Sequence, residues 1–267
     1  SAYIIGSNED LEFGLSLGMY HELTQVLIEE QGISSTAYDY MNGILSIRAD
    51  YLDTLDLEVI PFHIILDADF SFQPLIQTFQ YVNQIATLLS GYEGLNVSVD
   101  GVVTKILNNR LMFIEDETSV ISVYGDIDHI VVGDHVRVIG LKNIYHGLHQ
   151  MTNASIYNVM SHQNIISDPI LYDSNLDLTQ GQRFSFAGVM ITDLFEDIYG
   201  NIHFYIYDVT HDTYFPAMCD ARVENFMAIY EQLTSYDGQV VNIRDVILSF
   251  NHDFIFYITH TDEIYLR

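Results

Sequence analysis

Hydrophobic and polar residues alternate in short runs along most of the chain. Five runs rich in β-branched residues lie between Val97 and Val159, and Gly, Asn or Asp ends each run. Such runs are typical of strands joined by turns. Gly101 interrupts the first run, where a bend or a close approach of another backbone is the usual reason for glycine in a strand. The number of runs and this glycine predict a closed five-stranded barrel of the OB type at residues 95–160.

The same pattern occurs again in residues 181–267. The segment FSFAGVMIT (184–192) repeats VSVDGVVT (97–104), so that Gly188 corresponds to Gly101. Between the third and fourth predicted strands, the apolar residues of segment 221–233 have the spacing of one helix face. A repeat of this kind indicates duplication of one unit. We therefore predict a second OB-fold barrel of the same topology, with a helix between its third and fourth strands.

The first 83 residues are also predicted to form strands, with Met41-Asn42-Gly43-Ile44 as an Asn-Gly turn between two of them. Two connectors follow, at 83–94, with one helical turn near 85–89, and at 161–180. The predicted fold class is therefore all-β. An N-terminal sandwich at residues 1–83 precedes the barrels at 95–160 and 181–267.

The central barrel resembles a known group of modules. Five segments resemble the OB-fold modules appended to secreted bacterial nucleases and surface proteins: DGVVT (100–104), FIED (113–116), ISVYG (121–125), VGDHVRVIG (132–140) and YHGLHQ (145–150). The resemblance implies tandem OB folds in an extracellular or cell-surface bacterial protein. It leaves the function open, because this module serves as a binder or a spacer in many contexts.

The N-terminal segment has a second resemblance. AYDYMNGILSIRADYLDTL (37–55) and PFHIILDADF (61–70) resemble an immunoglobulin-like spacer module of secreted bacterial carbohydrate-active proteins. That module usually has a glycine after YL-x-x-L, where this chain has Leu57-Glu58. The resemblance implies an immunoglobulin-like β-sandwich at the N-terminus.

The charge is strongly one-sided, with 37 acidic and 9 basic residues and a net charge of −28. Such a field repels nucleic acid and favours cations, basic partners or a solvated surface. We therefore predict single-stranded nucleic acid to bind no tighter than roughly 10⁻⁴ M at physiological salt. Cys219 is the single cysteine, which excludes an internal disulfide. No apolar run approaches the roughly 18 residues of a membrane span, and Ser1 does not begin a signal peptide, so we expect a mature chain or a fragment.

Catalytic motifs are few. Gly14-Leu15-Ser16-Leu17-Gly18 fits the nucleophile-elbow pattern G-x-S-x-G. That elbow requires a sharp strand-to-helix turn in a parallel α/β sheet, so in an all-β chain we interpret the segment as small residues in a strand. No Walker loop, Rossmann glycine pattern, CxxC pair or HExxH occurs. We predict that the chain is not an enzyme, and we keep an unrecognised carboxylate site as an alternative.

Metal binding has one candidate segment. Asp193, Glu196, Asp197 and Asn201 lie in one predicted loop and carry the oxygen ligands that calcium prefers. An acidic, solvated hairpin is the simpler interpretation of this loop. A zinc site needs three or four ligands that converge on one point. His146 and His149 lie together in the segment YHGLHQ, but nothing places His129 and His135 near them, so we expect solvated or locally bonded histidines. We predict no cofactor, with calcium as the one exception to test.

An OB fold that binds a single strand combines a basic groove with aromatic rings that stack on bases. In the central barrel the candidate binding residues are Tyr124, Arg137, Lys142 and Tyr145. Further candidate rings are Tyr205 and Tyr207, and further candidate cations are Lys105 and Arg110.

The function predicted from these patterns is that of a non-catalytic structural or adhesive protein that forms a homo-oligomer, filament or surface layer through strand edges. Tyr3, Ile4 and Ile5 form an apolar terminal arm that can add to a neighbour's sheet, because exposed edges invite another strand. Pairing of the arm within its own domain is the alternative. The alternative function is that of a nucleic-acid- or glycan-binding accessory module of a secreted enzyme.

Overall fold

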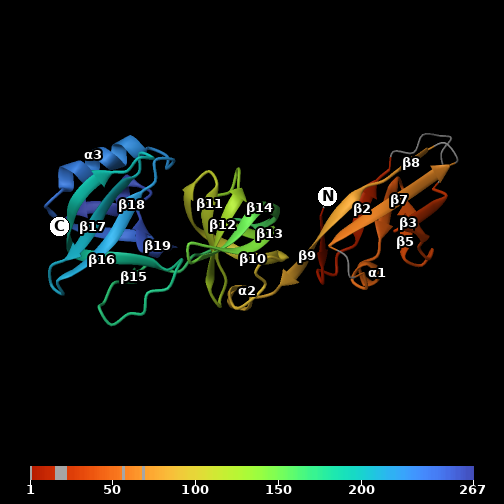
Figure 1. Cartoon of the computed structure of the whole chain (residues 1–267), viewed down its shortest axis with the longest axis horizontal. Coiled ribbons are helices and arrows are strands. Elements are labelled where there is room, and N and C mark those ends of the chain that lie inside the picture. Colours follow the sequence, from red (N-terminus) through yellow and green to blue (C-terminus); the bar gives the residue numbers. More distant parts are fainter. Residues whose placement is uncertain (1, 16–22, 56–57, 68–69) are drawn as a thin grey trace. The chain divides into compact units, whose positions relative to one another are not determined.

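The computed structural model describes residues 2–15, 23–55, 58–67 and 70–267. They form two compact units, residues 1–82 with 95–98, and residues 83–94 with 99–267 (Figure 1). Strands dominate both units, which confirms the all-β class. Within the described part of the chain, no helix has the length and apolar character to cross a membrane.

The first unit contains two sheets. In the smaller sheet the strand order is β2 (Leu11–Gly14), β6 (Ile44–Ile47) and β5 (Tyr38–Met41). The larger sheet consists of β9 (Leu75–Val82), β7 (Val59–Asp67), β3 (Gln25–Ile28) and β4 (Gln31–Gly32), with β1 (Ala2–Ile5) on β9 and β8 (Phe70–Phe72) on β7. The short helix α1 (Ala49–Leu52) follows β6. Asn42 and Gly43 both have positive φ, as the predicted Asn-Gly turn between β5 and β6 requires. The immunoglobulin-like assignment is not confirmed by this arrangement.

The N-terminal arm is part of its own unit. Strand β1 pairs in parallel with β9, and Tyr3 and Ile4 are buried in the core. The Tyr3 hydroxyl donates to Asp53 Oδ1 at 2.6 Å, and burial together with this carboxylate raises the pKa of Tyr3. The arm therefore pairs within its own unit, as the alternative interpretation has it, and its association with a neighbouring copy stays a prediction.

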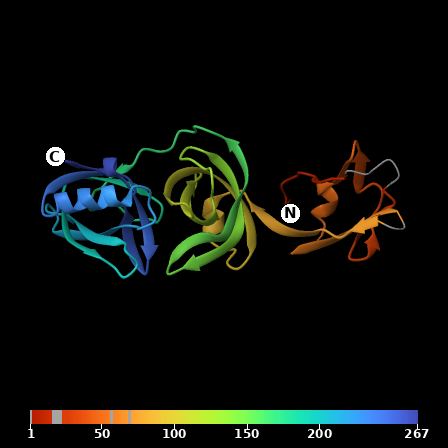
Figure 2. The ribbon, with the colours of Figure 1, turned by 90° about the horizontal axis from the view of Figure 1, so that it is seen from above.

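The second unit begins with α2 (Ile85–Leu89), at the helical turn expected in the first connector. A five-stranded barrel follows, consisting of β10 (Asn96–Asn108), β11 (Leu111–Glu115), β12 (Val120–Asp126), β13 (His135–Tyr145) and β14 (Leu148–Ser161). Its strand order is β10-β11-β12-β14-β13, with β13 returning to β10 and with β12 and β14 parallel. These strands form the ring seen in yellow and green in Figure 2. This is the predicted OB-type barrel.

The C-terminal barrel has the same strand order. It consists of β16 (Arg183–Glu196), β17 (Ile202–Asp208), β18 (Thr213–Cys219), β19 (Val240–Asn251) and β20 (Asp253–Tyr257). The parallel pair is β18 and β20, and β16 pairs with β19 to close the barrel. Helix α3 (Phe226–Tyr236) lies between β18 and β19, as predicted. Smaller elements are β15 (Ile170–Leu171), the 3₁₀ helix η1 (Thr261–Glu263) and β21 (Ile264–Leu266). The duplication predicted from the sequence is confirmed at the level of topology.

The two matched glycines have the roles expected of them. A Cβ atom on Gly101 would lie 3.1 Å from Glu115 O, so the partner strand approaches its backbone closely. Gly188 has φ +67° and lies where the register between β16 and β19 shifts. Each glycine therefore allows the first strand of its barrel to bend or to approach a neighbour.

The two barrels pack against each other within the second unit. Phe113, on the outer side of β11, lies in an apolar cluster with Ile247 of β19. The other buried members are Leu107 and Leu148, and the half-buried residues around them are Leu111, Val120, Phe250 and Tyr257. This cluster covers the outer face of strands β11 and β12.

A buried ion-pair network lies beside this cluster. Lys105 Nζ, from the first barrel, donates to Glu263 Oε1 at 2.5 Å and to the Asp245 carbonyl oxygen at 2.6 Å. Arg183 Nη1 donates to Asp245 Oδ1 at 2.5 Å. Lys105 and Glu263 are almost fully buried, so each charge depends on the other for its solvation.

The tips of two hairpins, one from each barrel, form a further contact. The His252 amide donates to the His146 carbonyl oxygen at 2.8 Å, and their rings lie 4.0 Å apart. His146 Nδ1 lies 3.0 Å from Asn251 Oδ1. Gly147 has a positive φ and lies against the Phe250 ring, where a Cβ atom would collide. The barrels are therefore joined by apolar, ionic and backbone contacts.

Candidate binding face on the C-terminal barrel

Strands β16 to β18 present a row of aromatic rings on the outside of the C-terminal barrel. In β17, Phe204 and Ile206 point into the core, while Tyr205 and Tyr207 alternate with them on the outer side. Tyr214 of β18 is paired with Tyr207 in the register. We name the outer residues the aromatic face, which consists of Phe195, His203, Tyr205, Tyr207 and Tyr214.

The rings of this face contact one another in two groups. Tyr207 and Tyr214 are stacked, with centroids 4.3 Å apart, and Tyr205 meets Tyr214 edge to face at 6.1 Å. Phe195 stacks on His203 at 5.1 Å. Phe195 and Tyr214 are more than half exposed, so the rings are arranged by their neighbours but remain open to solvent. Flat ligands can stack on such a surface, and the packed core does not have to rearrange to admit them.

Hydrogen bonds fix the polar groups beside the aromatic face. The Tyr207 hydroxyl donates to Asp212 Oδ1 at 3.0 Å, and this bond raises the pKa of Tyr207. The Asp208 carboxylate lies 2.6 Å from His211 Nδ1. Burial alone would raise the pKa of Asp208, but the bonds from His211 and from the Thr210 amide lower it. Asp212 therefore places an exposed carboxylate at the edge of the face, whereas Asp208 is buried and accepts bonds from Thr210 and His211.

The loop between β16 and β17 was the candidate calcium segment. Asp197 accepts hydrogen bonds from the amides of Tyr199 (2.8 Å) and Asn201 (3.0 Å) and from the Asn201 side chain, and His203 Nε2 lies 3.0 Å away. Burial opposes ionisation here, yet the bonds from Asn201 and His203 hold the pKa of Asp197 well below its usual range.

Asp197 therefore organises a tight hairpin, and its oxygens are occupied by protein donors. Asp193 and Glu196 are exposed at the end of β16. Among the residues that the structure describes, no group of three or more His, Cys, Asp or Glu side chains could hold a metal ion. The central-barrel histidines are among these described residues.

The candidate binding residues of the central barrel do not form one surface. Lys142 has no exposed side chain and lies 3.3 Å from both Glu93 Oε1 and His149 Nδ1. Burial, followed by the Lys142 charge, lowers the pKa of His149. Arg137 forms a bidentate pair with Asp100 at 2.7 and 2.9 Å.

The two tyrosines of that set lie at separate places. Tyr124 lies under the Arg110 guanidinium, whose carbon is 5.1 Å from the ring centroid. Tyr145 is exposed and stacks on His146 at 4.1 Å. Ser16 of the G-x-S-x-G segment falls outside the described residues.

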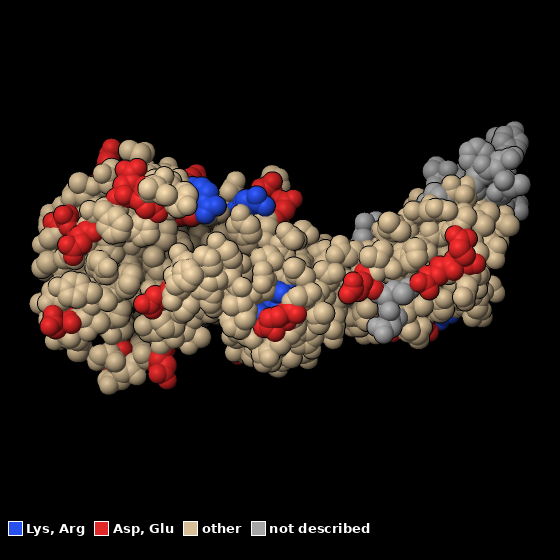
Figure 3. Space-filling view, in the orientation of Figure 1, with Lys and Arg blue, Asp and Glu red and all other residues tan. Residues whose placement is uncertain are grey.

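Most cations of the chain are committed to internal ion pairs. Within the residues that the structure describes, the Lys and Arg side chains that pair with Asp or Glu are Arg48, Lys105, Arg137, Lys142, Arg183, Arg222 and Arg244. Acidic side chains are spread over the view in Figure 3, and Lys and Arg are few. A ligand of the aromatic face therefore meets rings and acceptors more than free positive charge.

The chain matches no protein-family model and no curated protein. Among solved structures it is similar to a murine DNA-binding protein bound to double-stranded DNA, with TM-score 0.32, 9% identity, and coverage of 64% of this chain and 97% of that one. A structure described as "Structural mimicry for functional antagonism" has TM-score 0.31 and 11% identity, covering 68% and 99%. A HINb domain has TM-score 0.28 and 12% identity, covering 62% and 93%. These are loose likenesses, and the OB-type assignment rests on the strand pairings.

Two predictions from the sequence are corrected by these comparisons. We predicted a structural or adhesive protein, and we predicted that nucleic acid is disfavoured as a partner. The solved structures to which the chain is similar include that of a DNA-binding protein with DNA bound, so neither prediction is kept. The net charge of −28 describes the whole chain, whereas the exposed rings of the aromatic face offer stacking contacts that do not depend on charge. The bacterial source implied by the resemblances receives no support either.

Proposed function

We propose that the second unit is a binding module for single-stranded nucleic acid, whose bases stack on the aromatic face. The observation that carries this proposal is the row of exposed rings on β17 and β18. These are the second and third strands of the barrel, and OB folds bind oligonucleotides and oligosaccharides on that face. Base–aromatic stacking contributes about 1–3 kcal/mol per base and tolerates any sequence.

The paired cations predict an unusual salt dependence. Affinity for nucleic acid normally falls with salt because phosphate contacts release counterions. Here few free cations are present to make such contacts, and the acidic surface repels phosphates. Screening by salt weakens that repulsion, so binding should stay constant or strengthen as the salt concentration rises.

Fluorescence anisotropy with labelled single-stranded oligonucleotides tests the proposal at roughly 50 and 300 mM salt. The double variant Tyr205→Ala with Tyr214→Ala should bind at least about tenfold more weakly, because two stacking contacts are lost. Tyr265→Ala is the matched control, since Tyr265 is an exposed tyrosine on β21. Equal affinity of the double variant and the control, or no binding by the unaltered chain, would contradict the proposal.

An oligosaccharide is the second candidate ligand. The specific observation in its favour is the Asp212 carboxylate, which accepts from Tyr207 beside the rings, since sugar hydroxyls can donate to carboxylates. Binding of neutral oligosaccharides, lost in the same double variant and absent for oligonucleotides, would favour this ligand. Extracellular or cell-surface location and the lack of catalysis stay predictions, which cell fractionation and activity assays can test.

A further inference from the structure

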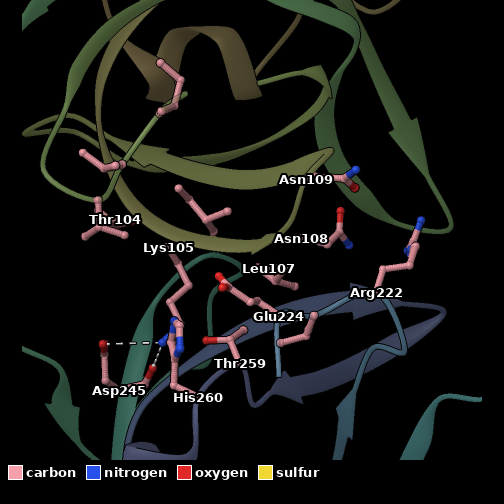
Figure 4. Close-up of a pocket in the computed structure, with 15 residues that line it drawn as sticks. Thr104, Lys105, Leu107, Asn108, Asn109, Arg222, Glu224, Asp245, Thr259 and His260 are labelled. Carbon is pink, nitrogen blue, oxygen red and sulfur yellow. Dashed lines mark hydrogen bonds and ion pairs between the residues drawn. The ribbon is translucent and has the colours of Figure 1, made fainter. Parts of the chain in front are cut away.

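A cleft of about 800 Å³ lies between the two barrels of the second unit, apart from the aromatic face (Figure 4). Residues 104–109 of β10 and its turn form one side together with loop 130–132. Loop 222–224, Asp245 and residues 259–260 of the C-terminal barrel form the other side. Its volume lies in the range of roughly 300–1,000 Å³ that is usual for small-molecule sites.

The walls of the cleft are largely apolar. Val131 is 57% exposed and Val132 46% exposed, while Leu107 and Val223 are buried behind the surface. At one end, Lys105 and Asp245 belong to the buried ion-pair network, so their charges are already balanced by protein partners. The walls therefore offer apolar contact area, and the exposed Glu224 adds one carboxylate to them.

The other end of the cleft carries planar polar groups, and Figure 4 shows Asn108, Asn109 and Arg222 there. Arg222 Nε and Nη2 donate to the buried Asp220 carboxylate at 2.9 and 2.6 Å. Asn108 Nδ2 donates to the same carboxylate at 3.4 Å. The Arg222 side chain is held flat and neutralised by Asp220, yet it is 55% exposed.

We propose that this cleft binds a nucleoside. In this arrangement the base lies against Val131, Val132 and the plane of the Arg222 guanidinium, and the polar edge of the base meets Asn109. Guanidinium planes and apolar side chains are surfaces on which unpaired bases stack. The exposed Asn109 carboxamide offers a donor and an acceptor side by side, which matches the edge of a base. The exposed Glu224 carboxylate and the net charge of −28 disfavour a phosphate and suit a neutral ligand.

The same chemistry is present in a free nucleoside and in an unpaired base of a single strand. A free nucleoside binds without phosphates, whereas a strand brings phosphates that the acidic surface repels. Separate titrations with adenosine, cytidine, guanosine and uridine, and with short oligonucleotides, distinguish the two sources. The inference does not require the aromatic face to bind anything.

Methyl-detected NMR of the full chain tests the proposal by titration with each nucleoside. At least one should shift the methyl signals of Val131 and Val132 in a saturable way, and the variant Val131→Asp should weaken that binding at least about tenfold. Val209→Asp is the matched control, because Val209 is 50% exposed in the turn after β17 and does not line the cleft. Both substitutions are at exposed positions, so the fold should persist.

The proposal fails if none of the four nucleosides gives a saturable shift up to roughly 10 mM. It also fails if Val131→Asp and Val209→Asp bind equally well. The double variant Tyr205→Ala with Tyr214→Ala should leave nucleoside binding unchanged, and a loss there would place the base on the aromatic face instead. Failure of oligonucleotide binding with intact nucleoside binding contradicts only the function proposed for the aromatic face.

Discussion

The two barrels of the second unit share one strand order but use the same face in opposite ways. In the central barrel, the middle of the outer side of β11 and β12 is buried, at Phe113 and Ser122, with Phe113 packed against Ile247. In the C-terminal barrel, the corresponding side of β17 and β18 is open and presents Tyr205 and Tyr214. A duplicated OB fold has two such faces, and here one attaches the second barrel while the other remains free for a ligand.

This difference separates stability from binding. A residue on the covered face is surrounded by the other barrel, so its replacement should affect the free energy of unfolding. A residue on the open face touches few core atoms, so its replacement should affect ligand affinity instead. Phe113→Ala and Tyr205→Ala test this division, and substitutions in two ion pairs of the second unit, with smaller expected effects, follow them.

Phe113→Ala should destabilise the second unit by about 3–5 kcal/mol, because it removes a fully buried ring and leaves a cavity between the barrels. Tyr205→Ala, on the corresponding strand of the C-terminal barrel, should cost less than about 1 kcal/mol. Chemical denaturation measures both values. Similar losses for the two variants would show that the faces do not differ as described.

Lys105→Met should destabilise the unit by about 3 kcal/mol, because Glu263 would keep a buried charge without its partner. Arg244→Met is a control, since the Arg244–Asp262 pair is exposed and should contribute less than about 1 kcal/mol. Thermal and chemical denaturation compare the two. A negligible effect of Lys105→Met would indicate that water reaches the network between the barrels.

Asp220→Asn should cost about 1.5–3 kcal/mol at neutral pH, because it weakens charged hydrogen bonds to Arg222. Burial would raise the pKa of Asp220, but the bonds from Arg222 and Asn108 lower it below its ordinary value. A lowered pKa in the folded state stabilises the fold above about pH 4, and this stabilisation is lost as the pH falls further. Denaturation between about pH 2 and 7 should therefore show a smaller pH dependence for Asp220→Asn. An unchanged pH dependence would exclude this role.

The sequence predicted the local structure well. Alternating runs and turn residues indicated both barrels, and the glycines at 101 and 188 marked the bends of their first strands. Helix α3 followed from the apolar spacing between the third and fourth strands. These features depend on residues close together in the chain, so their pattern is visible without a structure.

The aromatic face of the C-terminal barrel was harder to predict. Phe113 and Tyr205 are both aromatic residues on the outside of a strand, and only contacts with distant residues such as Ile247 decide which of them is covered. Lys142 was a candidate because of its charge, but its side chain is buried and its charge is paired with Glu93. The signal for the open face was present in β17, where every outward position from 203 to 207 carries an aromatic ring.

The covered face of the central barrel has a consequence for synthesis of the chain. Phe113 and Leu148 emerge from the ribosome early, whereas their cover, Ile247 and Phe250, lies near the C-terminus. At usual rates of translation, roughly a hundred further residues take on the order of 10 s. During this interval the central barrel carries a bare apolar surface, which chaperones can hold and which other nascent chains can contact. Synthesis of β19, which carries Ile247 and Phe250, ends that exposure.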